Sequence, residues 1–219
     1  MKVSVVSAWV SILSGLLALA HLVSLHFLSP EFDPSFRMIS EYALGSHGAV
    51  LSGMFLTWAL STFVLLFAIA PQVKGIGGKI GLVFLVLAAV GMTMGGLFDL
   101  RTPQHGFAFM LGVPALPIAA ILITKSLVRS KPWADHKKLL WWTAHATWIS
   151  FLLMGIAMGV MFYTFAQSGA KMDTTPRVDA VFPKGVIAYV GWPNRILVVA
   201  YIVWVIKVAW LSLKLQKKK

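Results

Sequence analysis

The sequence predicts an all-α polytopic membrane protein, a bundle of six transmembrane helices with both chain ends in the cytoplasm. Three observations predict this class. First, 58% of the 219 residues are hydrophobic and only 12% are charged, whereas a soluble domain is about a quarter charged. Second, six apolar runs come close to or exceed the roughly 20 residues that cross a bilayer. Third, basic residues collect between alternate runs, which sets the orientation.

The six runs cover residues 3–28, 49–71, 80–98, 107–128, 139–167 and 196–213. The first begins like a secretory signal peptide, with Lys2 before an apolar stretch and small residues at 18–20. It runs on to residue 28, beyond a typical signal core, so we expect a retained helix. Only connections are left over, so residues 1–219 form a single six-helix transmembrane domain.

Small residues, prolines and aromatic residues predict how the six helices pack. Small residues four positions apart predict close helix contacts at Gly77/Gly81, Gly91/Gly95 and Gly155/Gly159, with Ser11/Gly15 as a weaker version. In the fourth run, Pro114 and Pro117 free the carbonyls of Met110 and Val113, and we expect a kink filled by a neighbouring helix rather than a cavity wall. Aromatic residues predict interfacial anchors at Trp133, Trp141, Trp142 and Trp210 on one side and Tyr163 and Trp192 on the other.

Charge predicts the orientation. Thirteen of the nineteen basic residues fall at the two termini, in or beside the connections 72–79 and 130–138, or at nearby helix ends. The positive-inside rule therefore predicts a multi-pass protein of the inner (plasma) membrane with cytoplasmic termini. This basic face suits anionic membrane lipids, and no basic surface with base-stacking aromatics indicates a nucleic-acid partner. The opposite side carries six of the seven acids and the remaining basic residues, Arg37, Arg101, Lys171, Arg177, Lys184 and Arg195.

Three polar clusters, at residues 37–45, 99–106 and 191–195, each precede an apolar run on this outward side. Arginine beside helix N-termini forms a natural anion site, so a phospholipid phosphate or another anionic amphiphile is the expected ligand of an outward polar pocket. The alternative is that Glu41 pairs with Arg195, and Asp99 with Arg101 or Arg37, only to tie the loops down. The candidate ligand-binding residues are Arg37, Glu41, Tyr42, Asp99, Arg101, His105 and Arg195.

The same clusters contain acid–base residue types. Ser40, Glu41, Asp99 and His105 would suit a hydrolase or transferase acting on a lipid at the outer leaflet, with Ser40 as a nucleophile activated by a histidine. Serine, histidine and aspartate are also common at helix caps, so the sequence leaves it open whether the protein is an enzyme. The connection 168–195 exceeds the usual loop length and predicts a lid over the clusters.

Histidines within the runs raise a third alternative, a haem-binding electron-transfer protein. His26 and His105 are a candidate axial pair. However, His21 and His26 lie on different helix faces, and His145 has no histidine partner at its depth. Without cysteine, thiolate-ligated zinc and iron–sulfur clusters are excluded. We therefore expect no metal site and no cofactor, and a neutral histidine bonded to a neighbouring helix is the more usual arrangement.

Three motifs resemble a known family. They are residues 39–45 (ISEYALG), residues 95–99 (GGLFD) followed by His105 and Gly106, and residues 191–195 (GWPNR). Together they resemble the prokaryotic domain-of-unknown-function family 998 over nearly the whole chain. The resemblance implies a six-helix membrane protein and no established reaction. Members of the family often carry Glu-Arg before the last helix where this chain has Asn194 and Arg195, so chemistry that needs a carboxylate there is not expected.

Overall fold

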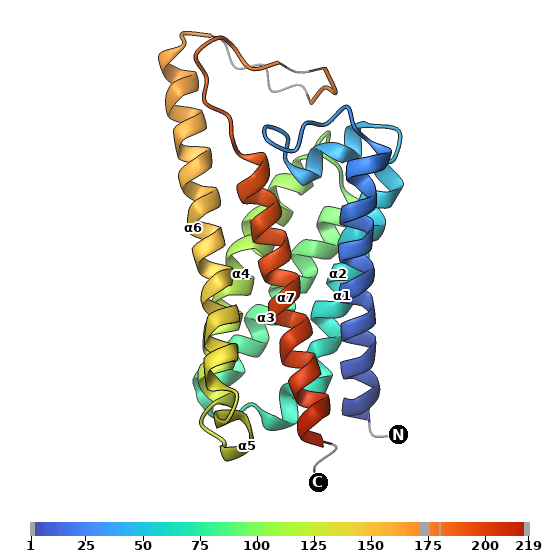
Figure 1. Cartoon of the computed structure of the whole chain (residues 1–219), viewed down its shortest axis with the longest axis vertical. Helices are drawn as coiled ribbons and strands as arrows, with labels where there is room; N and C mark the ends of the chain where they lie inside the picture. Colours follow the sequence, from blue (N-terminus) through green and yellow to red (C-terminus); the bar gives the residue numbers. More distant parts are fainter. Residues whose placement is uncertain (1–2, 171–175, 180, 217–219) are drawn as a thin grey trace.

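The computed structural model describes residues 3–170, 176–179 and 181–216, and all regular structure in those ranges is helical (Figure 1). The elements in chain order are α1 (Val3–Leu28), the 3₁₀ helix η1 (Ile39–Leu44), α2 (Gly48–Ile69), the 3₁₀ turn η2 (Ala70–Gln72), α3 (Gly75–Leu97), α4 (Pro103–Leu127), α5 (Lys131–Ala134), α6 (Lys137–Gln167) and α7 (Gly191–Gln216).

Six of these helices, namely α1, α2, α3, α4, α6 and α7, are long and apolar enough to cross a membrane. The start of α1 and the end of α7 lie together, because the Ser4 hydroxyl donates to Gln216 Oε1 at 2.8 Å. We call this the terminal end of the bundle; the opposite end, with η1 and the starts of α4 and α7, is the loop end (Figure 1). The predicted fold class is confirmed, while the assignment of the terminal end to the cytoplasm stays a prediction.

The apolar runs locate the helices well, and the largest differences lie at helix starts. α3 begins at Gly75 and α7 at Gly191, each five residues before the predicted start. α4 begins at Pro103, because proline lacks an N–H that the first helical position would leave unpaired. An apolar run predicts only the part of a helix that is buried in the membrane, so it misses a first turn made of polar residues.

Small residues let helices approach closely at two of the predicted places. A Cβ on Gly91 would collide with the backbone of Gly112 on α4. On the other side of the bundle, Ser11 and Ser61 each donate to the other's carbonyl, at 2.8 and 2.6 Å, and this ties α1 to α2.

The prediction for Gly155 and Gly159 is wrong, because a Cβ at either position would meet nothing within 4 Å. Both lie on α6, the least buried of the six long helices, where only 17% of the most apolar window is buried against 61% in α7. In the pair on α3, Gly81 is tightly packed and Gly77 is open. Spacing therefore identified suitable residues but could not show which helix faces have a neighbour.

Two further expectations concern single side chains. The kink of α4 is filled at the freed Val113 carbonyl, which accepts the Tyr201 hydroxyl of α7 at 2.7 Å. The expectation that this segment is not a cavity wall is wrong, because Met110 and Val113 line a cavity. Trp133 is not an interfacial anchor: it is buried, and its indole N–H donates to Gln72 Oε1 at 2.9 Å. Trp142 is 76% exposed, as an anchor should be.

Candidate functional site

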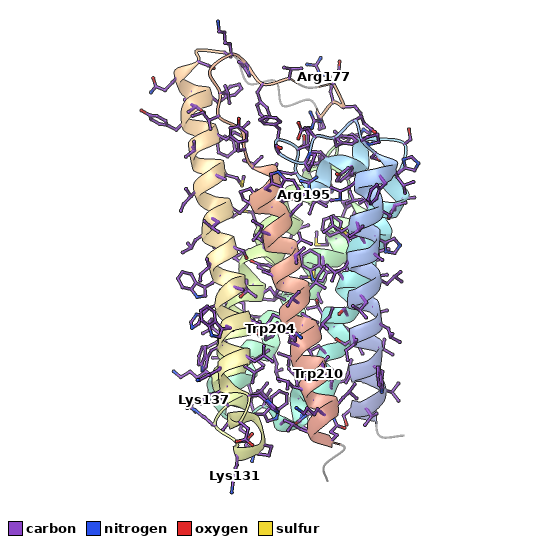
Figure 2. The ribbon with its side chains drawn as sticks, viewed as in Figure 1. Lys131, Lys137, Arg177, Arg195, Trp204 and Trp210 are labelled. Atoms are coloured by element: carbon purple, nitrogen blue, oxygen red, sulfur yellow. The ribbon has the colours of Figure 1, made fainter. Side chains whose placement is uncertain are left out.

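Arg195 organises the loop end of the bundle. It lies in the second turn of α7, only 4% exposed, near the loop that carries Arg177 (Figure 2). Its Nε–H donates to His26 Nε2 at 2.8 Å, and its terminal nitrogens donate to the Arg37 carbonyl at 2.7 Å and to the Tyr42 hydroxyl at 3.0 Å. Weaker or local bonds reach the carbonyls of Pro34 and Gly191. One buried guanidinium thus joins α1, the 29–38 connection, η1 and α7.

The first turn of α7 also bonds to the backbone of η1 and of the segment before it. The Gly191 N–H donates to the Ser35 carbonyl at 3.1 Å, and the Ile39 N–H donates to Asn194 Oδ1 at 2.8 Å. A side chain at Gly191 would collide with the Pro34 carbonyl, so glycine is required for this close approach. The ISEYALG and GWPNR motifs are therefore two halves of one structural unit.

Arg37 and Glu41 form a largely buried ion pair four residues apart, with Arg37 Nε 3.0 Å from Glu41 Oε1. The other carboxylate oxygen accepts the Met38 N–H at 2.6 Å, and Arg37 also donates to the Arg177 carbonyl at 2.8 Å. Burial raises the pKa of Glu41 above its usual value of 4.5, against the opposing effects of Arg37 and the Met38 N–H. The ion pair that the sequence suggested for Glu41 thus forms with Arg37 instead of Arg195.

His26 uses both ring nitrogens within the protein. Its Nδ1 lies 2.8 Å from the Leu22 carbonyl, which can only accept, so Nδ1 carries the proton and Nε2 accepts from Arg195. Axial ligation of haem by His26 would break the Arg195 bond. The described residues contain no cluster of three or more metal-ligating side chains.

Asp99, Arg101 and His105 form a second, more exposed group at the start of α4. Arg101 pairs with Asp99 at 2.9 Å, with side chains 59% and 34% exposed, and the Arg101 N–H donates to the same carboxylate. His105 Nδ1 lies 2.8 Å from the Phe98 carbonyl, so this nitrogen carries the proton and Nε2 is the acceptor. The structure therefore gives the three predicted arginines different partners: Arg37 and Arg195 sit in one buried cluster, and Arg101 sits in a surface pair.

A cavity of about 570 Å³ along α6 and a smaller one at Lys74 lie at the terminal end, away from both groups. The cavity that reaches the predicted site residues has a volume of about 420 Å³, and we call it the loop-end cavity. Its polar wall comes from Ser40, His105 and Asn194. Its apolar wall comes from α2, α3, α4, α6 and α7, and includes Phe55, Trp58, Met92, Met158, Leu197 and Tyr201.

Comparison with protein families identifies the chain. Residues 12–211 match the model of the family described as protein of unknown function DUF998. The chain belongs to this family. No curated protein and no solved structure matches it.

The connection before α7 packs onto the loop end of this DUF998 protein. The Phe36 and Tyr189 rings lie 5.0 Å apart, and Ala188 and Val190 are 2% and 1% exposed. Together with the bond from Arg37 to the Arg177 carbonyl, these contacts place Arg177 and Tyr189 beside the 33–37 segment. The Ile187 N–H donates to Thr164 Oγ1 on α6 at 3.0 Å. The sequence predicted that the connection 168–195 forms a lid over the polar clusters. Residues 171–175 and 180 of this connection lie outside the described ranges.

Three functional candidates escaped the sequence analysis. Asn194 was part of a motif but was not selected, although it bonds η1 and lines the cavity. Trp58 and Tyr201 lie deep in apolar runs, and no local pattern distinguishes them from ordinary core residues. The indole N–H of Trp58 is buried without a hydrogen-bond partner among the described residues, which is a costly state.

Proposed function

We propose that this protein binds a membrane lipid or another amphiphile in the loop-end cavity. The observation that carries the proposal is the distribution of polarity along the wall. Ser40, His105 and Asn194 supply hydrogen-bonding groups, while residues such as Phe55, Met92 and Leu197 supply an apolar surface within the helix bundle. A cavity of about 420 Å³ lies within the range of roughly 300–1,000 Å³ that small-molecule sites occupy. Such a site suits a ligand with a polar head and an apolar chain.

Access from the bilayer supports the same function. Met110 lines the cavity and is 69% exposed, so the cavity wall continues to the surface of α4. Because α4 is one of the membrane-crossing helices, a ligand can reach the cavity sideways from the lipid phase. We place the loop end outside the cytoplasm, and the protein in the inner (plasma) membrane, on the distribution of basic residues described above.

A pair of matched glycine variants tests the proposal. Gly95 lines the cavity, and the atoms nearest to an added Cβ belong to the Phe55 ring, at an ordinary 3.4 Å, so Gly95→Leu should fill the cavity without a backbone clash. Gly155→Leu adds the same side chain to the open face of α6. Native mass spectrometry should find lipid retained by the wild type and Gly155→Leu, and about tenfold less on Gly95→Leu. Equal retention by both variants would remove the cavity as the binding site.

Possible folding damage in Gly95→Leu is controlled by a second variant. Gly106→Leu places the same side chain at another lining position where a Cβ has open space around it. Both cavity variants should keep the unfolding temperature of the lipid-free wild type. If Gly95→Leu and Gly106→Leu both lose lipid while remaining folded, the cavity is the site from which the lipid is lost.

A second candidate function is a hydrolase or transferase acting on a lipid, and one observation favours it. Ser40 and His105 line the same cavity, and the bond of His105 Nδ1 to the Phe98 carbonyl leaves Nε2 free to take a proton from a serine hydroxyl. Asp99 pairs with Arg101 and is not bonded to His105. A fluorophosphonate probe should label Ser40 in the wild type, and neither Ser40→Ala nor His105→Phe, if this chemistry occurs; an unlabelled wild type would reject it.

A further inference from the structure

The wall of the loop-end cavity contains no charged side chain among the described residues: it lacks Asp, Glu, Lys and Arg. Arg195 is close in sequence, but its bonds go to His26, Tyr42 and backbone carbonyls of residues outside the wall. Arg37 is engaged with Glu41, and Arg101 with Asp99. An ionised group placed in an apolar space without a partner costs several kcal/mol. The part of a ligand that enters this cavity should therefore be neutral.

The hydrogen-bonding groups of the wall define the head more closely. His105 offers Nε2 as an acceptor, because its Nδ1 proton is committed to the Phe98 carbonyl. Asn194 offers its amide N–H groups as donors, because its Oδ1 already accepts the Ile39 N–H. A head group between them has to donate to one nitrogen and accept from the other, and the smallest neutral group that does both is a hydroxyl. The Ser40 hydroxyl, on the same wall, can take either role.

The volume limits the length of chain that fits. At about 30 Å³ for each water-sized group, 420 Å³ accommodates roughly 14 non-hydrogen atoms. This is one chain of about a dozen carbons with a small head, and the two chains of a phospholipid do not fit inside together. The remainder of a longer chain can leave past Met110, where the wall reaches the surface of α4.

We propose that the ligand is a neutral lipid alcohol, an apolar chain ending in a hydroxyl that lies between His105 Nε2 and the Asn194 amide. This inference rests on the proposed function of the cavity and names the class of its ligand. It differs from the anionic amphiphile that the arginines of the sequence suggest, because the head group meets none of those arginines.

Chain-matched photoprobes test the inference on the full-length protein in lipid nanodiscs. A diazirine-bearing dodecanol and the corresponding dodecanoate are crosslinked at neutral pH, and the labelled residues are mapped. The alcohol should label wall residues such as Phe109, Met110 and Met158 at least tenfold more than the carboxylate. Equal or stronger labelling by the carboxylate would overturn the neutral head while leaving the cavity as a lipid site. If neither probe labels the wall and Gly95→Leu changes nothing, the proposed function fails as well.

Two variants assign the hydroxyl contacts. Asn194→Asp keeps an acceptor for the Ile39 N–H but replaces the amide donor with a carboxylate, so labelling by the alcohol should fall about tenfold. His105→Phe removes the acceptor and should have a similar effect, which keeps the inference testable if Asn194→Asp folds poorly. Arg129→Gln lies at the terminal end, away from this cavity, and should leave labelling by the alcohol unchanged. Unchanged labelling in both wall variants would overturn the proposed position of the head group.

Discussion

Replacing Arg195 should destabilise the bundle more than replacing any other charged residue at the loop end. In Arg195→Gln, the Arg37 carbonyl, the Tyr42 hydroxyl and His26 Nε2 lose donors that lie 2.7, 3.0 and 2.8 Å away. Each is in a region where water has little access, since Arg195 is 4% and Tyr42 is 0% exposed. The glutamine amide can recover one of the three bonds at most.

The magnitude follows from the two groups left unsatisfied. A buried polar group without a partner costs about 1–3 kcal/mol, and relief from burying a guanidinium charge offsets part of the sum. We expect the free energy of unfolding to fall by about 2–4 kcal/mol. The free energy of unfolding of Arg195→Lys should fall nearly as far. A single ammonium group cannot reach the acceptors on α1, η1 and the 29–38 connection at the same time.

Unfolding of the purified protein by SDS titration in mixed micelles measures these differences. Arg101→Gln is the matched control, since it makes the same substitution in a pair that is largely exposed and should cost no more than about 1 kcal/mol. If Arg195→Gln loses no more stability than Arg101→Gln, the central role of Arg195 is refuted. If Arg195→Lys retains wild-type stability, charge rather than hydrogen-bond geometry is what matters.

Three other predictions follow from single positions. Gly91→Ala should destabilise the bundle by about 1–3 kcal/mol through overpacking against the backbone of α4, whereas Gly155→Ala on the open face of α6 should be neutral or slightly stabilising in the same titration. The raised pKa of Glu41 means that the folded state holds this proton to higher pH than the unfolded state; its contribution to stability is complete below the usual value and is lost as pH rises through the folded pKa. The difference in unfolding free energy between wild type and Glu41→Gln should therefore change over that pH interval, and a pH-independent difference would contradict the buried carboxyl. Since the chain has no native cysteine, Ser46→Cys should react with an impermeant thiol reagent outside intact cells and Ser130→Cys should not; the reverse pattern would invert the orientation.

The sequence predicted the membrane-spanning helices well, because their signal is local. An apolar run of the right length is sufficient to locate α1, whose bounds agree with the prediction. The small-residue pair at Gly91 succeeded for a different reason: a neighbouring helix happens to present Gly112 to it. The equivalent pair on α6 has no such neighbour, and no property of residues 155–159 alone could have shown this.

The sequence predicted which polar residues gather at the loop end better than it predicted their contacts. The motifs selected Arg37, Glu41 and Arg195 correctly as residues of one region, but the partner of each depends on directions that only the folded loop determines. Arg37 lies just before η1 and only four residues from Glu41, so these two side chains pair locally, and Arg195 is left to neutral acceptors. The sequence predicted a polar pocket at this end of the bundle, but it could not show the apolar wall of the cavity, because that wall is formed by residues from five different helices.

The position of α7 has a consequence for how the protein is made. This helix is the most buried of the six and packs against α1, α2, α4 and α6, yet it leaves the ribosome after the other five. Until α7 inserts, His26 and Tyr42 lack the Arg195 guanidinium that they bind in the finished structure. The faces of the earlier helices that will pack against α7 contact lipid or one another. Synthesis runs from the N-terminus, so α1 and α2, and α3 and α4, can pair before α7 is made. The contacts that Arg195 makes with α1 and η1 form only when α7 inserts.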